Sequence, residues 1–357
     1  MSLQRLAIED FRCVERAELE FDRRCNLVSG RNASGKTSLL EAIFFLGRGR
    51  SFRTNRAETL VRAGASQFTL TGRIDTSGVS QPIGMRVTRD GIEARYAGRP
   101  VSGLAELATR LPVQAIDPEV HRLVDGGPQE RRRYLDWGVF HVEPAFVDHW
   151  RRYQRALRQR NAALKAGQAP ALIHAWDPDL LEAGQIVADH RERYVERLRA
   201  AVSSTGQRLL GLDIELVLSR GWSAERSFKE SLEASYARDR ERGLTHSGPH
   251  RADIAVRVDG HPARDRVSRG QQKLVAAAML LGQLQSDAEQ GSGVAALLVD
   301  DPAAELDSGS LDRLLMEVLA LPSQLFITAL DPSNPALQCL PPGPRFHVEH
   351  GAVTRLI

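Results

Sequence analysis

The sequence contains the octapeptide Gly30-Arg31-Asn32-Ala33-Ser34-Gly35-Lys36-Thr37, which Ser38 follows. This octapeptide matches the P-loop pattern Gly-x-x-x-x-Gly-Lys-Ser/Thr at every position. A short apolar run at residues 26–29 precedes it, and apolar residues at helical spacing follow it, at positions 39, 40, 43 and 46. The loop is therefore predicted to join a strand to a helix, which is the setting that a P-loop requires.

The residue types of this loop indicate what it binds. Glycines allow backbone N–H groups to point at a phosphate, and the N-terminus of the following helix adds partial positive charge. Lys36 can reach the β- and γ-phosphates of ATP and act in catalysis, and the Thr37 hydroxyl can bind Mg²⁺. Arginine fits a tight phosphate cradle poorly. Among 48 Lys and Arg residues, the only lysines are Lys36, Lys165, Lys229 and Lys273, so a lysine at this position favours a specific role.

Length and composition set the class of protein. The 357 residues, of which 42% are hydrophobic, are enough for a sizeable core and are expected to form two lobes. No apolar run reaches the ~20 residues that cross a membrane and the N-terminus lacks a signal pattern, so we expect a cytoplasmic protein without a membrane partner. Cys13, Cys25 and Cys339 have neither metal-ligand spacing nor the even count of a disulfide framework. A net charge of +3 permits nucleic acid as a partner without requiring it.

The order of strand and helix patterns divides the chain. Alternating apolar and polar positions predict a β-hairpin over residues 3–29 that leads into the P-loop, and further strands at 68–74 and 83–87. Helical patterns dominate residues 118–210, strand patterns return at 214–218 and 254–258, and a long helix is predicted over 268–289. The predicted fold class is α/β. It has an ATPase lobe of residues 1–115 plus 290–357 and an inserted, mainly α-helical lobe of residues 116–289.

A P-loop needs an acidic partner for its metal ion, and two aspartates follow the apolar run at residues 294–299. This run looks like a Walker B strand. Asp300 is expected to hold Mg²⁺, and Asp301 is expected to act as the general base that orients the attacking water. Gln114 falls where a Q-loop glutamine touches the ion, so the predicted metal ligands are Thr37, Asp300 and Gln114.

Two further motifs carry a resemblance to a known class of ATPase. Ser268-Arg269-Gly270-Gln271 stands at the start of the predicted long helix, and Glu305-Leu306-Asp307 follows the two aspartates. With the P-loop and the Walker B strand, they resemble the signature motif and D-loop of ABC-type ATPases. The resemblance implies a dimer whose two heads enclose two ATP molecules, with Ser268, Gly270, Gln271 and Asp307 at the nucleotide. Lys273 fits either a specific role or a solvated first-turn side chain.

Local strings narrow the resemblance. The chain contains Asp10-Phe11-Arg12, Gly47-Arg48-Gly49-Arg50-Ser51-Phe52-Arg53-Thr54, Arg131-Arg132-Arg133-Tyr134-Leu135-Asp136 and Gly248-Pro249-His250-Arg251. Together with the nucleotide motifs they resemble the RecF family over nearly the whole chain. The resemblance implies a recombination mediator that binds double-stranded DNA and single/double-strand junctions, dimerises with ATP and hydrolyses it slowly and in a DNA-dependent way. Its partners would be RecO and RecR, with which it would help to load RecA at gaps.

Two positions depart from transporter cassettes of the ABC class. Asp301 stands where a glutamate is usual, and Thr328-Ala329 stands where those cassettes carry a switch histidine. A shorter base and a missing histidine predict slow hydrolysis. ATP hydrolysis would then time how long the dimer holds DNA, without driving movement.

Two basic stretches without acidic residues, 48–56 and 151–160, are candidates for binding DNA. In the second stretch Arg151, Arg155 and Arg158 share one helical face, which can follow DNA phosphates or be merely solvated. Phosphate contacts would give little sequence preference and a steep dependence on salt. With Arg50 and Arg53 from the first stretch, these are the predicted DNA contacts. His250 fits either a dimer cleft or a structural turn.

Two other functions remain open. One is the ATPase subunit of a membrane transporter, which the arginine-rich insertion and the missing switch histidine disfavour. The other is a nucleotide-gated binding protein without useful turnover, in which Asp301 is not the base. An Asp301→Asn variant tests the role of this residue. If Asp301 is the base, the variant loses hydrolysis but keeps ATP-dependent dimerisation.

Overall fold

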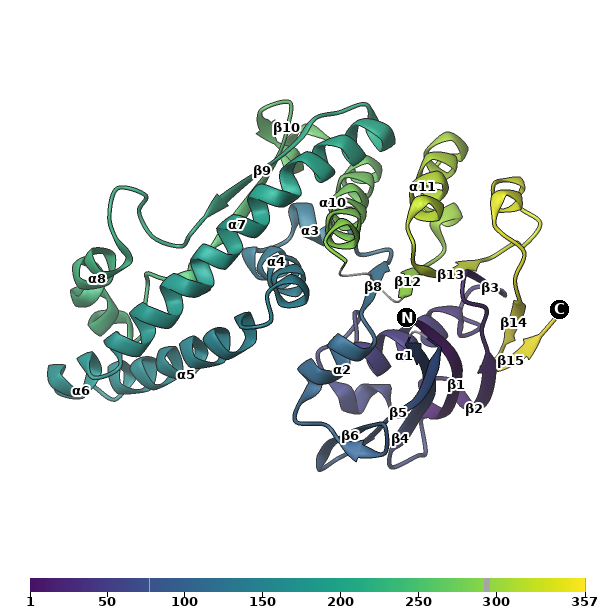
Figure 1. The fold of residues 1–357 in the computed structure, drawn as a ribbon, viewed down its shortest axis with the longest axis horizontal. Coiled ribbons are helices and arrows are strands. Elements are labelled where there is room, and N and C mark those ends of the chain that lie inside the picture. The colour runs from purple at the N-terminus through teal and green to yellow at the C-terminus, as the bar shows by residue number, and fades with distance from the viewer. Residues whose placement is uncertain (77, 292–295, 357) are drawn as a thin grey trace. The chain divides into compact units, whose positions relative to one another are not determined.

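The computed structural model describes residues 1–76, 78–291 and 296–356. Figure 1 shows the chain, which divides into two compact units: Met1–Val120 with Gly291–Ile357, and His121–Gln290. The first boundary falls later than the predicted 115/116 because β8 (Val113–Ile116) pairs in parallel with β12 (Ala296–Val299) and so belongs wholly to the first unit. Residues 294 and 295 of the predicted Walker B strand lie outside the described residues.

A mostly parallel sheet forms the centre of the first unit. Its strand order is β15-β14-β3-β13-β12-β8, in which only β15 (Ala352–Arg355) runs antiparallel to its neighbour β14 (Arg345–Glu349). The inner strands β3 (Cys25–Ser29), β13 (Gln324–Ala329) and β12 are buried at every position. Burial along their whole length reflects a parallel sheet that is covered on both faces.

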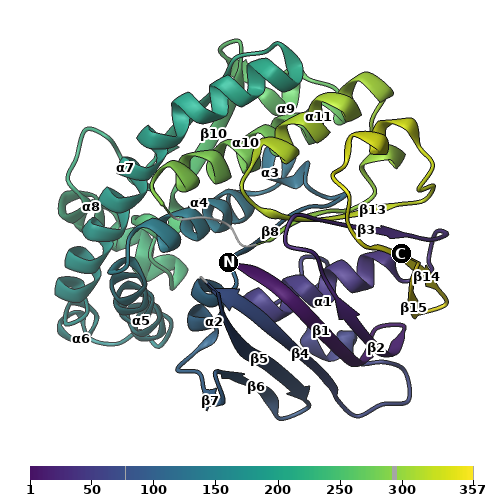
Figure 2. The same ribbon diagram turned by 45° about the vertical axis from the view of Figure 1, so that its right-hand side comes forward.

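A second, antiparallel sheet shares the core of this unit, and Figure 2 shows its strands side by side with α1 next to them. Its order is β2-β1-β4-β5-β6-β7. The P-loop helix α1 (Lys36–Arg48) contacts strands of both sheets, and Phe45 of α1 packs edge-on against Phe68 of β4. The sheet consists of β1 (Ser2–Phe11), β2 (Val14–Glu20), β4 (Phe68–Thr76), β5 (Val79–Thr88), β6 (Gly91–Tyr96) and β7 (Arg99–Pro100).

Shorter elements complete the first unit. These are α2 (Leu104–Arg110), α11 (Ser308–Ala320) and the 3-10 turns η1 (Ala57–Leu60), η3 (Pro302–Ala304) and η4 (Pro335–Cys339). The turn η3 follows the paired aspartates directly, and α11 follows η3. The end of β12 is thus joined to a helix by a tight connection.

The second unit is mainly helical, as the sequence predicted. Its long helix α7 (Asp177–Leu210) contacts α4, α5 and α10 and a small antiparallel sheet of order β11-β10-β9 (Figure 1). The predicted strands at 214–218 and 254–258 correspond to β9 (Ile214–Ser219) and β10 (Asp253–Val258). The other elements are α3 (Arg122–Asp125), α4 (Pro128–Val142), α5 (Phe146–Lys165), α6 (Pro170–His174), α8 (Phe228–Arg242), η2 (Pro249–Arg251), β11 (His261–Pro262), α9 (Ala263–Arg266) and α10 (Arg269–Glu289).

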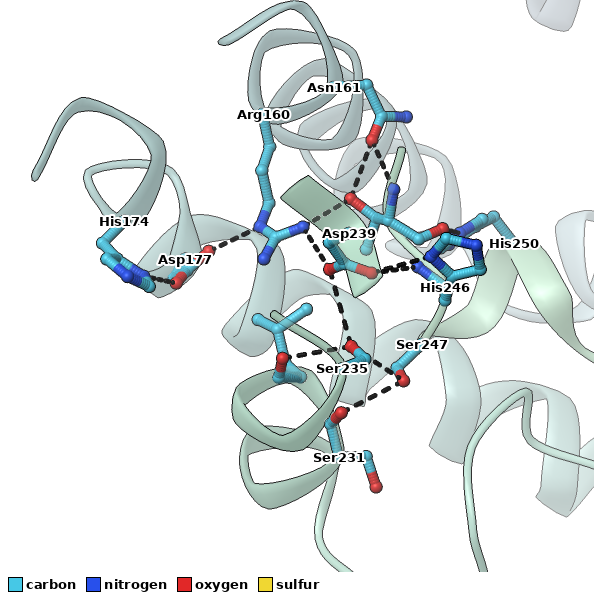
Figure 3. Close-up of polar contacts among 12 residues, drawn as sticks. Arg160, Asn161, His174, Asp177, Ser231, Ser235, Asp239, His246, Ser247 and His250 are labelled. Atoms are coloured by element: carbon cyan, nitrogen blue, oxygen red, sulfur yellow. Dashed lines mark hydrogen bonds and ion pairs between the residues drawn. The ribbon is translucent and has the colours of Figure 1, made fainter. Parts of the chain in front are cut away.

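A buried arginine ties together the part of this unit formed by α5, α7 and α8 (Figure 3). Arg160 is 0% exposed and donates from Nε to Asp177 Oδ1 and from Nη1 to Asp239 Oδ2, both at 2.8 Å. Nη1 also donates to Thr245 Oγ1 at 2.7 Å, while His246 donates its backbone N–H to the other oxygen of Asp239. Because charges are buried stably only when they are paired, these contacts fix the loop after α8 against α5.

The arginine-rich string at 131–136 and the string at 248–251 are also structural in this unit. Arg131 binds both carboxylate oxygens of Asp253, and Arg132 donates to the carbonyl of Ala252. His250 accepts from Tyr153 at Nδ1 (2.5 Å) and donates from Nε2 to the Thr245 carbonyl (2.8 Å). Burial lowers the pKa of His250 to about 4, so the ring stays neutral. Of the two interpretations of His250, its contacts favour the structural one.

Within the described ranges, no helix is long and apolar enough to cross a membrane.

Candidate nucleotide-binding site

The predicted P-loop connects β3 to α1, as expected, and two of its positions accept only glycine. Gly30 has φ 154° and Gly35 has φ 118°, in a region that side chains disfavour. A Cβ atom on Gly30 would lie 2.3 Å from the Val348 carbonyl, and one on Gly35 would lie 2.9 Å from Cys13 Sγ. The loop is therefore held tightly between the β1–β2 turn and the β14–β15 hairpin.

Polar groups of the loop point inward. Lys36 is only 6% exposed, and its Nζ donates to the carbonyls of Gly30 (2.8 Å) and Arg31 (3.1 Å), which places the ammonium group over the loop. Ser34 Oγ is buried without a hydrogen-bond partner in the part of the chain that the structure describes. An inward ammonium beside an unsatisfied hydroxyl fits the oxygens of a phosphate.

The first aspartate after β12 is bound by two hydroxyl groups. Thr37 Oγ1 donates to Asp300 Oδ2 at 2.8 Å, and Thr328 Oγ1 donates to Asp300 Oδ1 at 2.7 Å. The three residues stand at the carboxyl ends of adjacent parallel elements, β3 with its helix, β12 and β13. A carboxylate next to the P-loop threonine fits a Mg²⁺ ion, which prefers oxygen ligands.

The second aspartate is strained and half-buried. Asp301 has φ 44° and ψ 55°, a left-handed conformation that costs a non-glycine residue about 1–2 kcal/mol. Its Oδ1 is buried and, among the described residues, finds no hydrogen-bond partner. Burial raises the pKa of Asp301, while the positive charge of Lys36 opposes this shift. Such a carboxylate is suited to accept a proton.

These groups surround a single cavity of about 370 Å³ within the first unit. P-loop residues 32–38 line it together with Asp300 and Asp301. This volume lies in the range of small-ligand sites. The structure thus brings together Lys36, Thr37, Asp300 and Asp301, which the sequence predicted separately.

Gln114 does not join this group. Its Oε1 accepts a hydrogen bond from Arg48 Nη2 at 2.9 Å. Pro118, which follows β8, lines the cavity, whereas Gln114 is not among the lining residues that the structure describes. The physical reason is that β8 continues to Ile116, so Gln114 lies within the strand and not at its carboxyl end. The structure thus shows Gln114 bonded to Arg48, and its role as a metal ligand stays a prediction.

Arg53, a predicted DNA contact, also lies at this site. It lines the nucleotide cavity, with Nη1 at 3.9 Å from Glu41 Oε2. Glu41 is completely buried in α1 and is bound by Arg12 through both carboxylate oxygens. Arg50 and Arg53 are both exposed, so both stay predicted DNA contacts, and Arg53 is also part of the cavity wall. A count of arginines carries no sign of this second position.

The signature and D-loop residues build exposed helix N-termini. Ser268 caps α10 in a reciprocal pair with Gln271, and Gly270 stands in the first turn. Asp307 caps α11 by accepting from the backbone N–H and the hydroxyl of Ser310, which lowers the pKa of Asp307. Both ends present backbone N–H groups to solvent, where an anion is stabilised.

The candidate DNA residues of α5 separate into two sets. Arg151, Arg155 and Arg158 are exposed, and Arg151 has Asp148 at 3.7 Å. Arg160 is buried in the network of Figure 3, and Arg152 pairs with Asp179 and Glu182. Of these five arginines, the first three thus keep side chains available to a polyanion.

Comparison with known proteins places this site in context. A family model described as the RecF/RecN/SMC N terminal domain matches residues 2–336. The chain is 39% identical to the DNA replication and repair protein RecF of Shewanella pealeana over 357 residues, and 41% identical to that of Thioalkalivibrio sulfidiphilus over 358 residues. In both cases 99% of each chain is covered.

Solved structures give the same relationship. The recombination mediator protein RecF with ATP, of the RecFOR pathway, superposes with a TM-score of 0.90 at 26% identity, covering 100% of this chain and 98% of that one. The Smc head domain from Pyrococcus furiosus bound to ScpA has a TM-score of 0.59 at 15% identity, covering 99% and 96%. The second likeness concerns the fold alone, which is that of an ABC-type ATPase head.

Proposed function

Because the chain belongs to the RecF family of DNA replication and repair proteins, we propose that it is an ATP-dependent recombination mediator. In this proposal it binds DNA as an ATP-linked dimer and helps to load RecA at gaps together with RecO and RecR. One observation carries the nucleotide part: Lys36, Thr37 and the two aspartates surround a single cavity. A relative at 26% identity is named as RecF with ATP, which supports the same ligand.

ATP would be held by the P-loop and its magnesium ion by the Thr37–Asp300 pair. The N–H groups of the loop and Lys36 Nζ would bind the phosphates, and the Ser34 hydroxyl would gain a partner. Thr37 Oγ1 already donates its proton to Asp300, so its lone pairs are free for a metal ion. A bound Mg²⁺ ion supplies neutralisation of charge on the β- and γ-phosphates.

Asp301 would act as the base in hydrolysis. Its unsatisfied Oδ1 can accept a proton from a water molecule whose oxygen bonds to the γ-phosphorus. The bond from phosphorus to the bridging oxygen then breaks, and ADP carries away that electron pair. A side chain shorter than glutamate leaves Asp301 farther from the water, which supports the proposal of slow turnover that times DNA binding.

Dimerisation would complete the site. Ser268, Gly270, Gln271 and Asp307 are exposed at helix N-termini, which suits them to contact the γ-phosphate held by a second copy of the chain. ATP binding and pairing would then be thermodynamically linked, so each would strengthen the other by the same factor.

Replacement of Lys36 by Arg tests this linkage. We expect the variant to lose about 1.5–3 kcal/mol of ATP binding, because the planar guanidinium cannot reproduce a charge-assisted bond within the tight loop. Sizing of both proteins with and without ATP, Mg²⁺ and DNA should show ATP-dependent pairing of the wild type only. A matched control is Lys229→Arg, since Lys229 is exposed on α8. Dimerisation of the Lys36→Arg variant at the same ATP concentrations as the wild-type protein would contradict the proposal.

DNA binding would use the exposed arginines of α5. Changing Arg151, Arg155 and Arg158 to Ala should weaken DNA binding and reduce the slope of log K against log salt by about 0.9 for each phosphate that is no longer neutralised. Fluorescence anisotropy at several salt concentrations measures both quantities. The control changes Arg86, Arg95 and Arg99, which are exposed in the first unit and carry the same total charge. Equal losses in both variants, or none in the first, would reject the α5 face.

A further inference from the structure

The central strand β13 carries a residue that touches both aspartates of the site. We propose that Thr328 is a positioning residue for ATP hydrolysis, which holds Asp300 and Asp301 in register through one hydroxyl group. This inference rests on the proposed function.

The hydroxyl group of Thr328 makes two hydrogen bonds, one with each aspartate. Its hydroxyl donates to Asp300 Oδ1 at 2.7 Å and accepts from the backbone N–H of Asp301 at 2.8 Å. A hydroxyl has one proton to donate, and here Asp300 receives it. Thr37 holds the other oxygen of Asp300, so two hydroxyls fix the plane of this carboxylate. The orientation of the metal-binding acid is therefore set from α1 and β13 together.

The same contact stabilises the strained backbone of Asp301. The residue departs from the strand at φ 44°, where a non-glycine residue persists only if its surroundings hold it. The bond from its N–H to Thr328 supplies one such restraint. The hydroxyl of Thr328 thus restrains the backbone of the proposed base.

A purely structural role does not explain a threonine at this position. Thr328 is 0% exposed in a strand whose neighbours are apolar, and valine has nearly the same shape and packs equally well. A buried hydroxyl costs free energy unless it is hydrogen-bonded. Both hydrogen bonds of this hydroxyl go to the two aspartates, so its contribution is directed to the site.

The test replaces the hydroxyl and then restores it. We expect Thr328→Val to lower kcat for ATP hydrolysis at least about tenfold while the Kd for ATP changes less than about twofold, because a misplaced base impairs the chemical step and not binding. Thr328→Ser should keep kcat within about threefold of wild type. Thr205→Val removes a buried hydroxyl of α7 and serves as the matched control. If Thr328→Val does not fold, Thr328→Cys replaces it, since a thiol is a weak donor of similar size.

The split between kcat and the Kd for ATP is a readout that separates positioning from packing, because lost packing would impair nucleotide binding as well. Wild-type kcat in Thr328→Val, or an equal loss in the serine variant, overturns the role of Thr328 while leaving the proposed function intact. Absence of hydrolysis by the wild-type protein with Mg²⁺ and DNA overturns both.

Discussion

Replacing Asp301 by Asn is expected to lower kcat for ATP hydrolysis about 10²–10³-fold while ATP still brings two copies together, since general-base catalysis contributes this much. Asparagine has nearly the same shape but cannot accept the proton of the attacking water. The contacts of the P-loop and of Asp300 with the nucleotide would remain. Single-turnover hydrolysis and sizing with ATP measure the two properties separately.

The pH dependence of the wild-type enzyme belongs to the same prediction. Burial raises the pKa of Asp301, and only the carboxylate can accept a proton. The kcat for hydrolysis should therefore have its full value above this raised pKa and fall as the pH drops through it. This fall should occur at a higher pH than an ordinary aspartate would give. The Asn variant should lack this acid limb. Hydrolysis by Asp301→Asn at the wild-type rate would instead favour a gated binding protein in which Asp301 is not the base.

Replacing Arg160 by Met is expected to destabilise the second unit by about 3–5 kcal/mol, the usual effect of removing one partner from a buried ion pair. Asp239 is completely buried and Asp177 is partly buried, and both would lose the guanidinium group that pairs with them (Figure 3). Methionine keeps the aliphatic bulk of the side chain, so the loss reports on charge more than on packing. Thermal and urea unfolding followed by circular dichroism measure the change.

The control for this prediction lies on the same helix. Arg158→Met removes the same charge from α5 at an exposed position and should change the free energy of unfolding by less than about 0.5 kcal/mol. Equal stability of the two variants would show that the buried network contributes little. The comparison also separates the roles of these two arginines, because Arg158 is a proposed DNA contact and Arg160 is not.

The sequence predicted those parts of the site that lie in continuous motifs. The P-loop and the paired aspartates depend on residues adjacent in the chain, and the structure places Lys36, Thr37, Asp300 and Asp301 as expected. The sequence marks Thr328 only as part of the pair Thr328-Ala329, where a switch histidine is absent. It does not indicate the contacts of Thr328, because these arise from the parallel pairing of β13 with β12. A long-range pairing of this kind has no local pattern.

Two predicted contacts show what a sequence pattern leaves open. The motif predicts Gln114 beside the metal ion, whereas the structure shows Gln114 within β8 and bonded to Arg48. Charge groups Arg53 with its neighbours, but charge does not show which side chain lines a cavity. Sequence patterns therefore predict that a helix or strand exists more reliably than they predict where its side chains point.

The interrupted chain path of the first unit has a consequence for biosynthesis. β3 and the P-loop are made early, but their sheet partners β13 and β14 follow the whole second unit in the chain. The second unit is continuous, so we expect it to collapse first on the ribosome while the apolar β3 and α1 await their partners. The nucleotide site would then mature last. Newly made chains would pass through a stage in which they need protection from aggregation and cannot yet respond to ATP.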